Sequence, residues 1–350
     1  MKHFSTSKVS VTPMIIANDM RMPLTDTHRQ FVRQLVLGAA KRREPVICFD
    51  PVVDHDLRSA VFAASLEANI EPLYFNPAQP DESIRLDLLR KGEDPSVLSR
   101  KVCSLVDPLG SSPVFTGFTH MILTTVFQGM LLVDVRPTLE SLARNLEDFE
   151  SLFIAVMTDH CDQLFIPNWR DGLAHYRAAT VKELNRVHGG NLSERLATNE
   201  ALAKQIESSA LAKFYDSRIN GTRVDSRELR NLCSIAEHPS EHRIRMMSYF
   251  MNMLLSLLDE RYRSVLSMAG NADGRQPNES SFPNVIDQCN TLYIGLDTSF
   301  DPLALNALGR MIVADMGLVM GDITRYWSIS TFMEVRAPLP MFGMRDMEAA

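Results

Sequence analysis

The sequence predicts an α/β fold in which both ends of the chain form one parallel sheet around a large all-α insertion. Short, continuously apolar runs at 46–50, 72–75 and 291–296 have the profile of strands buried on both faces. Between about 95 and 265, amphipathic helical segments follow one another and strand signals nearly vanish. These observations divide the chain into an N-terminal α/β part, an all-α domain, and a return to the α/β layer with an irregular tail, at 1–94, 95–268 and 269–350.

The first part of the chain alternates between helical and strand patterns. Thr25 offers an N-cap, apolar residues then recur with helical spacing, and Pro45 ends the helix. Asp50 and Pro51 end the first buried strand in the same way that Asn76 and Pro77 end the next one. We therefore expect an irregular segment, a helix, a strand, a helix and a strand, at 1–27, about 28–43, 46–50, about 54–69 and 72–75.

The helical block and the return to the sheet follow from proline, glycine and apolar spacing. The block contains candidate helices at 95–107, 114–132, 137–147, 149–163, 170–187, 193–213, 225–236 and 239–268. Glycine, asparagine and serine predict a flexible loop over 269–284. A strand at 291–296 and a helix at about 301–325 follow, and the tail after 328 is poorly patterned.

Composition and charge exclude several classes of protein. An apolar fraction of 45% excludes a disordered chain, and the formal charge of −7 predicts weak binding of DNA by the chain alone. The five widely spaced cysteines indicate reduced thiols in a cytosolic compartment. The two most apolar stretches, 120–135 and 246–258, are too polar or too short to cross a bilayer, so the sequence predicts no transmembrane segment.

The usual glycine-rich phosphate loop is missing. Backbone N–H groups converge on phosphates where glycine permits close approach, yet the chain has no Gly-Lys dipeptide and no glycine between 17 and 28. That segment carries Asp19 and Asp26 instead, whose charges repel phosphate. Asp50 and Asp54 remain the candidate nucleotide or Mg²⁺ residues, because ligands of open α/β sheets collect beyond the carboxyl ends of strands. The alternative is that they cap the strand end and form a turn.

Other motifs have a structural reading that we favour over a catalytic one. The apolar run that ends in Asp259-Glu260 continues a helical pattern, and 331–335 is expected to be an edge strand. His238, Glu241 and His242 match the spacing of a zinc motif, but Pro239 indicates a helix start. The residues of 159–162 are adjacent on a helix and point in different directions, so they are not expected to share one metal ion.

An ordered series of segments resembles conjugative coupling proteins of the TraD/TraG kind. The stretch 44–57 contains Asp50-Pro51-Val52-Val53-Asp54 where the family has Asp-Pro-Lys-Gly-Asp. The stretch 72–80 is similar to its Phe-His-Pro-Ala segment, and 237–242 is similar to a helix start in its all-α domain. The stretch 291–302, with Leu292-Tyr293-Ile294-Gly295-Leu296-Asp297, is similar to a strand and the helix start that follows it. The resemblance covers about 25–327.

The resemblance implies a RecA-like motor domain, here incomplete, with an inserted all-α domain. Family members are ATPases of type IV secretion and integrative-element transfer that assemble as hexamers at the inner membrane and deliver relaxosome-bound DNA. Thr27-His28 stands where Lys-Thr would complete the Walker A motif, and the chain ends near where Walker B would begin. The resemblance therefore concerns the middle portion of a coupling protein and leaves no catalytic residue to name.

These features predict a coupling protein homologue that acts in DNA transfer and is catalytically degenerate or truncated. ATP and Mg²⁺ are the cofactors that the family implies. Relaxosome and secretion proteins are the implied partners, with DNA and other copies of the chain as further ones. The expected location is cytoplasmic, with attachment to the inner membrane face through partners. The first alternative is a non-catalytic interaction or assembly protein, and the second is a metal enzyme that uses His238 and His242.

Overall fold

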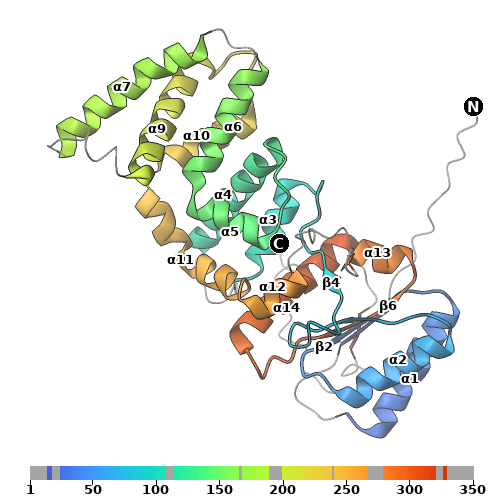
Figure 1. Cartoon of the computed structure of the whole chain (residues 1–350). Helices are drawn as coiled ribbons and strands as arrows, with labels where there is room; N and C mark the ends of the chain where they lie inside the picture. Colours follow the sequence, from blue (N-terminus) through green and yellow to red (C-terminus); the bar gives the residue numbers. More distant parts are fainter. Residues whose placement is uncertain are drawn as a thin grey trace, which may run out of the picture. The chain divides into compact units, whose positions relative to one another are not determined.

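In the computed structural model, the protein is a mostly helical α/β chain with a parallel sheet and two compact units. The structure describes residues 14–17, 24–106, 113–164, 168–188, 199–238, 240–266, 279–320 and 326–328. The α/β unit comprises Met1–Leu88, Ser104–Gly110 and Leu255–Ala350, and the helical unit comprises Leu89–Cys103 and Ser111–Leu254 (Figure 1). The α/β unit thus combines segments from the early and the late part of the chain. None of the helices within the described ranges is long and apolar enough to cross a membrane.

The α/β unit contains all the strands that the structure describes. In chain order its elements are β1 (Met14–Ala17), α1 (Asp26–Lys41), β2 (Val46–Asp50), α2 (His55–Glu67), β3 (Leu73–Phe75), β4 (Arg85–Leu86), α12 (Glu260–Leu266), β5 (Glu279–Ser280), α13 (Phe282–Asp287), β6 (Thr291–Gly295), α14 (Pro302–Met320) and β7 (Tyr326–Ser328). The helical unit contains α3 (Pro95–Cys103), α4 (Pro113–Leu132), α5 (Leu139–Glu147), α6 (Phe149–Gln163), α7 (Trp169–His188), α9 (Glu200–Arg218), α10 (Arg227–Glu237) and nearly all of α11 (Ser240–Ser256).

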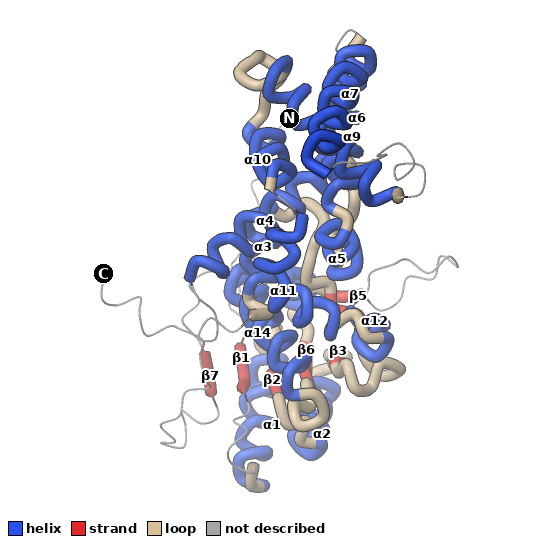
Figure 2. Tube along the Cα trace, turned by 90° about the vertical axis from the view of Figure 1, so that its left-hand side faces the viewer, coloured by secondary structure: helices blue, strands red, loops and turns tan. Residues whose placement is uncertain are grey.

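The main sheet is parallel and has the strand order β3-β6-β2-β1-β7 (Figure 2). The predicted strands at 46–50, 72–75 and 291–296 lie side by side in it, with Cys48 opposite Tyr293 and Tyr293 opposite Tyr74. Because β6 lies between β2 and β3, the late strand joins the two early ones. A second, two-stranded sheet pairs β4 with β5.

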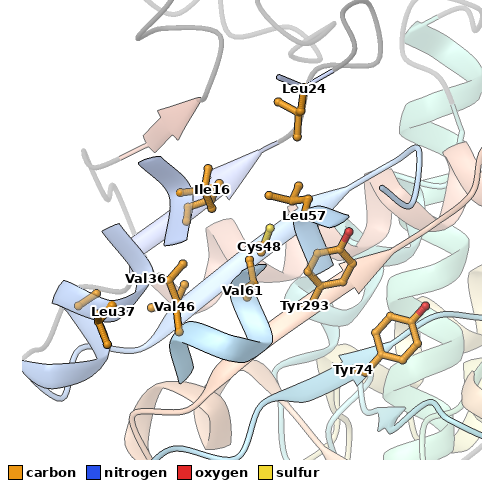
Figure 3. Packing of buried hydrophobic residues seen from close by; sticks show 13 residues of the cluster. Ile16, Leu24, Val36, Leu37, Val46, Cys48, Leu57, Val61, Tyr74 and Tyr293 are labelled. Atoms are coloured by element: carbon orange, nitrogen blue, oxygen red, sulfur yellow. The ribbon is translucent and has the colours of Figure 1, made fainter. Parts of the chain in front are cut away.

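Helices cover the main sheet on both faces. Alternate residues of β2 point to opposite faces, so Val46 and Cys48 pack with α1 and α2 in a cluster that also includes Val36 and Val61 (Figure 3). On the other face, a Cβ at Gly309 of α14 would lie 3.5 Å from Phe49 and 3.1 Å from Leu296. Each residue of β2 is buried, as the apolar run predicts.

Four sequence-based expectations about the elements are wrong. The N-terminal segment contains a strand, β1, because Met14–Ala17 pairs in register with β2. The predicted loop at 269–284 contains β5 and the start of α13. No strand was expected directly after the helix at about 301–325, where β7 lies. The predicted helix 239–268 is two helices, since Asp259 starts a new one by accepting from the Arg261 N–H at 3.1 Å. The expected strand at 331–335 lies outside the described residues.

Polar contacts between helices fix their pairing within the helical unit. Arg243 of α11 pairs with Glu150 of α6 and donates to the carbonyl of His238 at 2.9 Å. Lys204 of α9 pairs with Asp148 at 2.6 Å, at the N-terminus of α6.

Lys101 is fully buried, and its ammonium lies 2.7 Å from a carboxylate oxygen of Glu93. A buried cation needs such a partner, because an unpaired charge is strongly unfavourable in an apolar interior.

Candidate functional site: the carboxyl edge of the sheet

Asp50 ends β2 with its side chain fully buried. One carboxylate oxygen accepts from the Val52 N–H at 3.0 Å, and the other accepts from the Asp54 N–H at 2.7 Å. The Tyr293 hydroxyl of β6 donates to the second oxygen. The carboxylate is thus held by the turn that it begins and by the neighbouring strand. Asp50 therefore builds the turn.

Asp54 caps the helix that follows this turn. Its side chain accepts from the Leu57 N–H at 2.8 Å, as an N-cap does, and pairs with Arg29 of α1 at 3.0 Å. Burial alone raises the pKa of Asp54. The hydrogen bonds from Arg29 and from the Leu57 N–H outweigh burial and lower the pKa below the ordinary value. Asp54 therefore links α2 to α1 as an ionised cap.

The turn between Asp50 and Asp54 has a strained backbone. Val53 has φ 58°, in the left-handed region that favours glycine and is rare for a β-branched residue. Gly295 at the end of β6 makes room for this valine, because a Cβ at that position would lie 3.2 Å from Val53 Cγ2. The Leu296 N–H and the Thr298 N–H donate to the carbonyls of Asp50 and Pro51 at 3.1 and 3.0 Å. Contacts from Gly295 of β6 and from the residues that follow it thus hold the strained turn in place.

The N-terminus of α1 is closed by its own side chains. The Thr25 hydroxyl accepts from the His28 N–H, and the His28 ring accepts from the Thr25 N–H, in a reciprocal capping box. Asp26 in the first turn is 92% exposed and pairs with Arg29, which also pairs with Asp54. In a P-loop protein, this helix end and its positive dipole would face phosphate. Here, capping groups and carboxylates occupy the described end of this helix, so the residues present there do not fit the phosphates of ATP.

Two further aspartates at this edge have structural roles. Asp301 directly precedes α14. Its side chain accepts hydrogen bonds from the Ala304 N–H at 3.1 Å and from the Tyr262 hydroxyl at 2.8 Å. Asp297 accepts from the Ser299 hydroxyl at 2.5 Å. Among the described residues, the edge therefore presents carboxylates that cap turns and helices. This arrangement can order the loops that follow the strands.

The other sequence candidates do not form a site. His238 and His242 make edge-to-face contacts with Phe118, with ring centroids 6.3 and 6.0 Å from it, and His238 caps the end of α10. Pro239 lies outside the described residues. Asp162 accepts from Trp169 and Arg170, while the His160 ring lies 3.0 Å from the Val224 carbonyl. Over the described part of the chain, no three metal-binding side chains come together. The run before Asp259 is helical, as predicted.

Sequence reasoning missed a pocket beside β3. It has a volume of about 730 Å³ and lies between α2, β3, the turn at 82–84 and α13. Its walls come from segments that are about 200 residues apart in the chain, so no local motif signals it. Phe62 of α2 and Tyr74 of β3 are the aromatic residues in its lining.

Comparisons with known proteins do not relate the chain to a known family. No protein-family profile, curated protein or solved structure gives a significant match to the chain.

Proposed function

We propose that this chain is a degenerate homologue of conjugative coupling proteins, with an incomplete RecA-like layer and an inserted all-α domain. In this proposal it acts in DNA transfer through a type IV secretion system by binding other components and does not hydrolyse ATP. Its partners would be the motor, relaxosome or secretion proteins, at the cytoplasmic face of the inner membrane. The non-catalytic role is favoured over the motor role because of the groups that occupy the edge of the sheet.

The conformation of Val53 is the observation that carries the proposal. The resembled family has glycine at the corresponding position of its Asp-Pro-Lys-Gly-Asp segment, and Val53 adopts φ 58°, which suits glycine. A valine in this conformation is the expected trace of an ancestral turn that carried glycine. The turn is also bonded to Tyr293, so the two most similar stretches of sequence lie against each other. Both features support a common origin with coupling proteins.

The capped N-terminus of α1 supports the loss of catalysis. A phosphate would have to displace the Thr25–His28 capping box and approach the carboxylates of Asp26 and Asp54. Repulsion between these carboxylates and a bound phosphate would raise the free energy of the phosphate-bound state. No observation on the described residues favours a metal enzyme, because His238 and His242 are not joined there by a third metal-binding side chain.

Thermal unfolding with Mg-ATP tests the non-catalytic role. A ligand at 100 times its Kd stabilises a protein by about 2.7 kcal/mol, which is a shift of several degrees in Tm. We expect no shift over a concentration series, with a known ATPase as the positive control. A saturating upward shift that disappears in Arg29→Gln would show that the edge binds nucleotide, and would contradict this role.

A transfer assay tests the biological process. Deletion of the gene from a host that carries its conjugative element should lower the frequency of DNA transfer. A complementing copy should restore transfer, and so should Asp54→Asn, because the proposal gives this carboxylate no nucleotide to bind. Unchanged transfer after the deletion would contradict a role in conjugation.

A further inference from the structure

The pocket beside β3 lies on an edge strand, away from the capped turns at the carboxyl edge. β3 is the last strand of the main sheet, with β6 on one side only. Consecutive residues 71–74 all line the pocket, so the backbone of this edge forms one of its walls. A volume of about 730 Å³ lies within the range of roughly 300–1,000 Å³ that is usual for ligand sites. The pocket is therefore large enough for a few residues of an extended chain.

The chain itself already uses half of this edge for hydrogen bonding. The Ile84 N–H donates to the Tyr74 carbonyl at 2.7 Å, and the Ser83 hydroxyl accepts from the Asn76 N–H at 3.0 Å. Because backbone groups alternate along a strand, the outward bond at Tyr74 places the Tyr74 N–H and the Pro72 carbonyl on the same outer side. The Pro72 carbonyl can accept a hydrogen bond from one residue of an added strand, and the Tyr74 N–H can donate a hydrogen bond to the same residue.

The side chains around this edge favour a basic residue. Glu82 lies 3.4 Å from the Arg58 guanidinium, which in turn lies 4.8 Å from the centroid of the Tyr74 ring. Glu71 is exposed at the start of β3 and pairs with no cation among the described residues. Phe62 is partly buried on the Tyr74 face and offers an apolar surface to the next side chain of an added strand, because successive side chains point to opposite faces. The lining thus has one more carboxylate than it has cations.

We propose that the pocket binds an extended peptide segment of a partner protein by strand addition to β3. The residue of the added strand that bonds to the Pro72 carbonyl and the Tyr74 N–H would lie in register with Leu73. Its lysine or arginine side chain would lie on the Leu73 face of the sheet, beside Glu71. Strand addition derives affinity from backbone hydrogen bonds and specificity from the pockets that receive alternate side chains. This inference does not depend on the coupling-protein proposal, because it uses only the geometry of β3 and α2.

Capped peptide pools test the proposal on the full chain. Each pool carries one fixed central residue, lysine, glutamate or valine, between randomised β-prone neighbours, and binding is measured by fluorescence anisotropy. We expect the lysine pool to bind best and the glutamate pool to bind worst. A lysine pool with an N-methylated central backbone should lose binding, because it cannot donate to the Pro72 carbonyl. Binding that survives N-methylation, or no binding by any pool, would overturn the proposal.

Variants then locate the binding. Glu71→Gln should weaken binding of the lysine pool roughly two- to five-fold, as expected for one exposed ion pair. Asn284→Trp should fill the pocket from the exposed face of α13 and abolish binding without lowering Tm. Asp287→Asn is the matched control, because this exposed carboxylate of α13 does not line the pocket. Full binding by Asn284→Trp would place the peptide elsewhere. The peptide assay tests binding to this pocket alone, whereas thermal unfolding with Mg-ATP and the DNA transfer assay test the proposed function.

Discussion

Asp50 is the buried residue on which the turn after β2 depends. Its place at the end of a buried strand predicted either a site residue or a turn-former, and nothing in the sequence decides between them. In the structure, the Val52 N–H, the Asp54 N–H and the Tyr293 hydroxyl all donate to its carboxylate. A buried carboxylate is stable when such bonds replace water. The deciding partner, Tyr293, is more than 200 residues away in the chain.

Tyr293→Phe should lower the free energy of unfolding by about 1–3 kcal/mol, because the buried side chain of Asp50 loses a hydrogen bond. Urea unfolding followed by circular dichroism measures the change. Tyr249→Phe is the control, since Tyr249 is 48% exposed and should alter stability little. Equal effects in the two variants would show that the Asp50–Tyr293 bond does not stabilise the turn.

Val53→Gly should stabilise the protein by about 1 kcal/mol, because the strain of a left-handed valine exceeds the entropic cost of glycine. The neighbouring change Val52→Gly should destabilise instead, since Val52 does not have a positive φ. Parallel urea titrations of both variants give the comparison. A loss of stability in Val53→Gly would mean that the contact with Gly295 outweighs the strain.

The capped start of α2 gives stability a pH dependence. The lowered pKa of Asp54 means that the folded protein favours the ionised form more than the unfolded chain does. Its contribution is therefore complete above an unfolded pKa of about 3.9 and is lost as pH falls through the folded value. Asp54→Asn keeps an N-cap and removes the charge, so it should be less stable by about 1 kcal/mol at neutral pH.

Urea unfolding from neutral pH down to pH 3 tests this dependence. The difference between the wild type and Asp54→Asn should shrink as pH falls below about 4. Asp26→Asn is the control, because that carboxylate also pairs with Arg29 but is 92% exposed. A difference that stays constant across this range would show that the charge of Asp54 contributes nothing.

Elements with their own local pattern were predictable from the sequence. The strand at Val46–Asp50 and the helix at Asp26–Lys41 have continuous apolar or amphipathic patterns and recognisable ends. β1 was missed because its four residues become a strand only by pairing with β2. The break between α11 and α12 was missed because the apolar spacing continues through it, while Asp259 restarts the backbone bonding. Local pattern therefore predicts elements better than it predicts pairings.

At the scale of the whole molecule, the sequence predicted one sheet formed from both chain ends but not its order. The position of β6 between β2 and β3 depends on side chains from all three strands. Tyr293 of β6 lies opposite Cys48 of β2 and opposite Tyr74 of β3. The pocket beside β3 was missed for the same reason, because α2, β3 and α13 contribute to it together. Cys48, Cys161 and Cys233 are buried, whereas Cys103 and Cys289 are half-buried.

Net charge limits what the whole chain can bind. With a formal charge of −7, the purified protein should bind duplex DNA more weakly than the roughly 10⁻⁴ to 10⁻⁶ M typical of non-specific binding at physiological salt. Anisotropy of a labelled duplex, over a salt series, measures this. Tight binding that falls steeply with salt would reveal a local basic surface and would contradict the prediction.

The position of β6 also delays the completion of the sheet during synthesis on the ribosome. Roughly 215 residues separate the end of β3 from the start of β6, so at about 5–20 residues per second the early strands wait on the order of 10–40 s for the strand between them. During that interval, β2 and β3 each expose an unfilled edge to the nascent chain and its surroundings. The helical unit can complete its core first, so a chaperone would act on the N-terminal strands while the later helices fold.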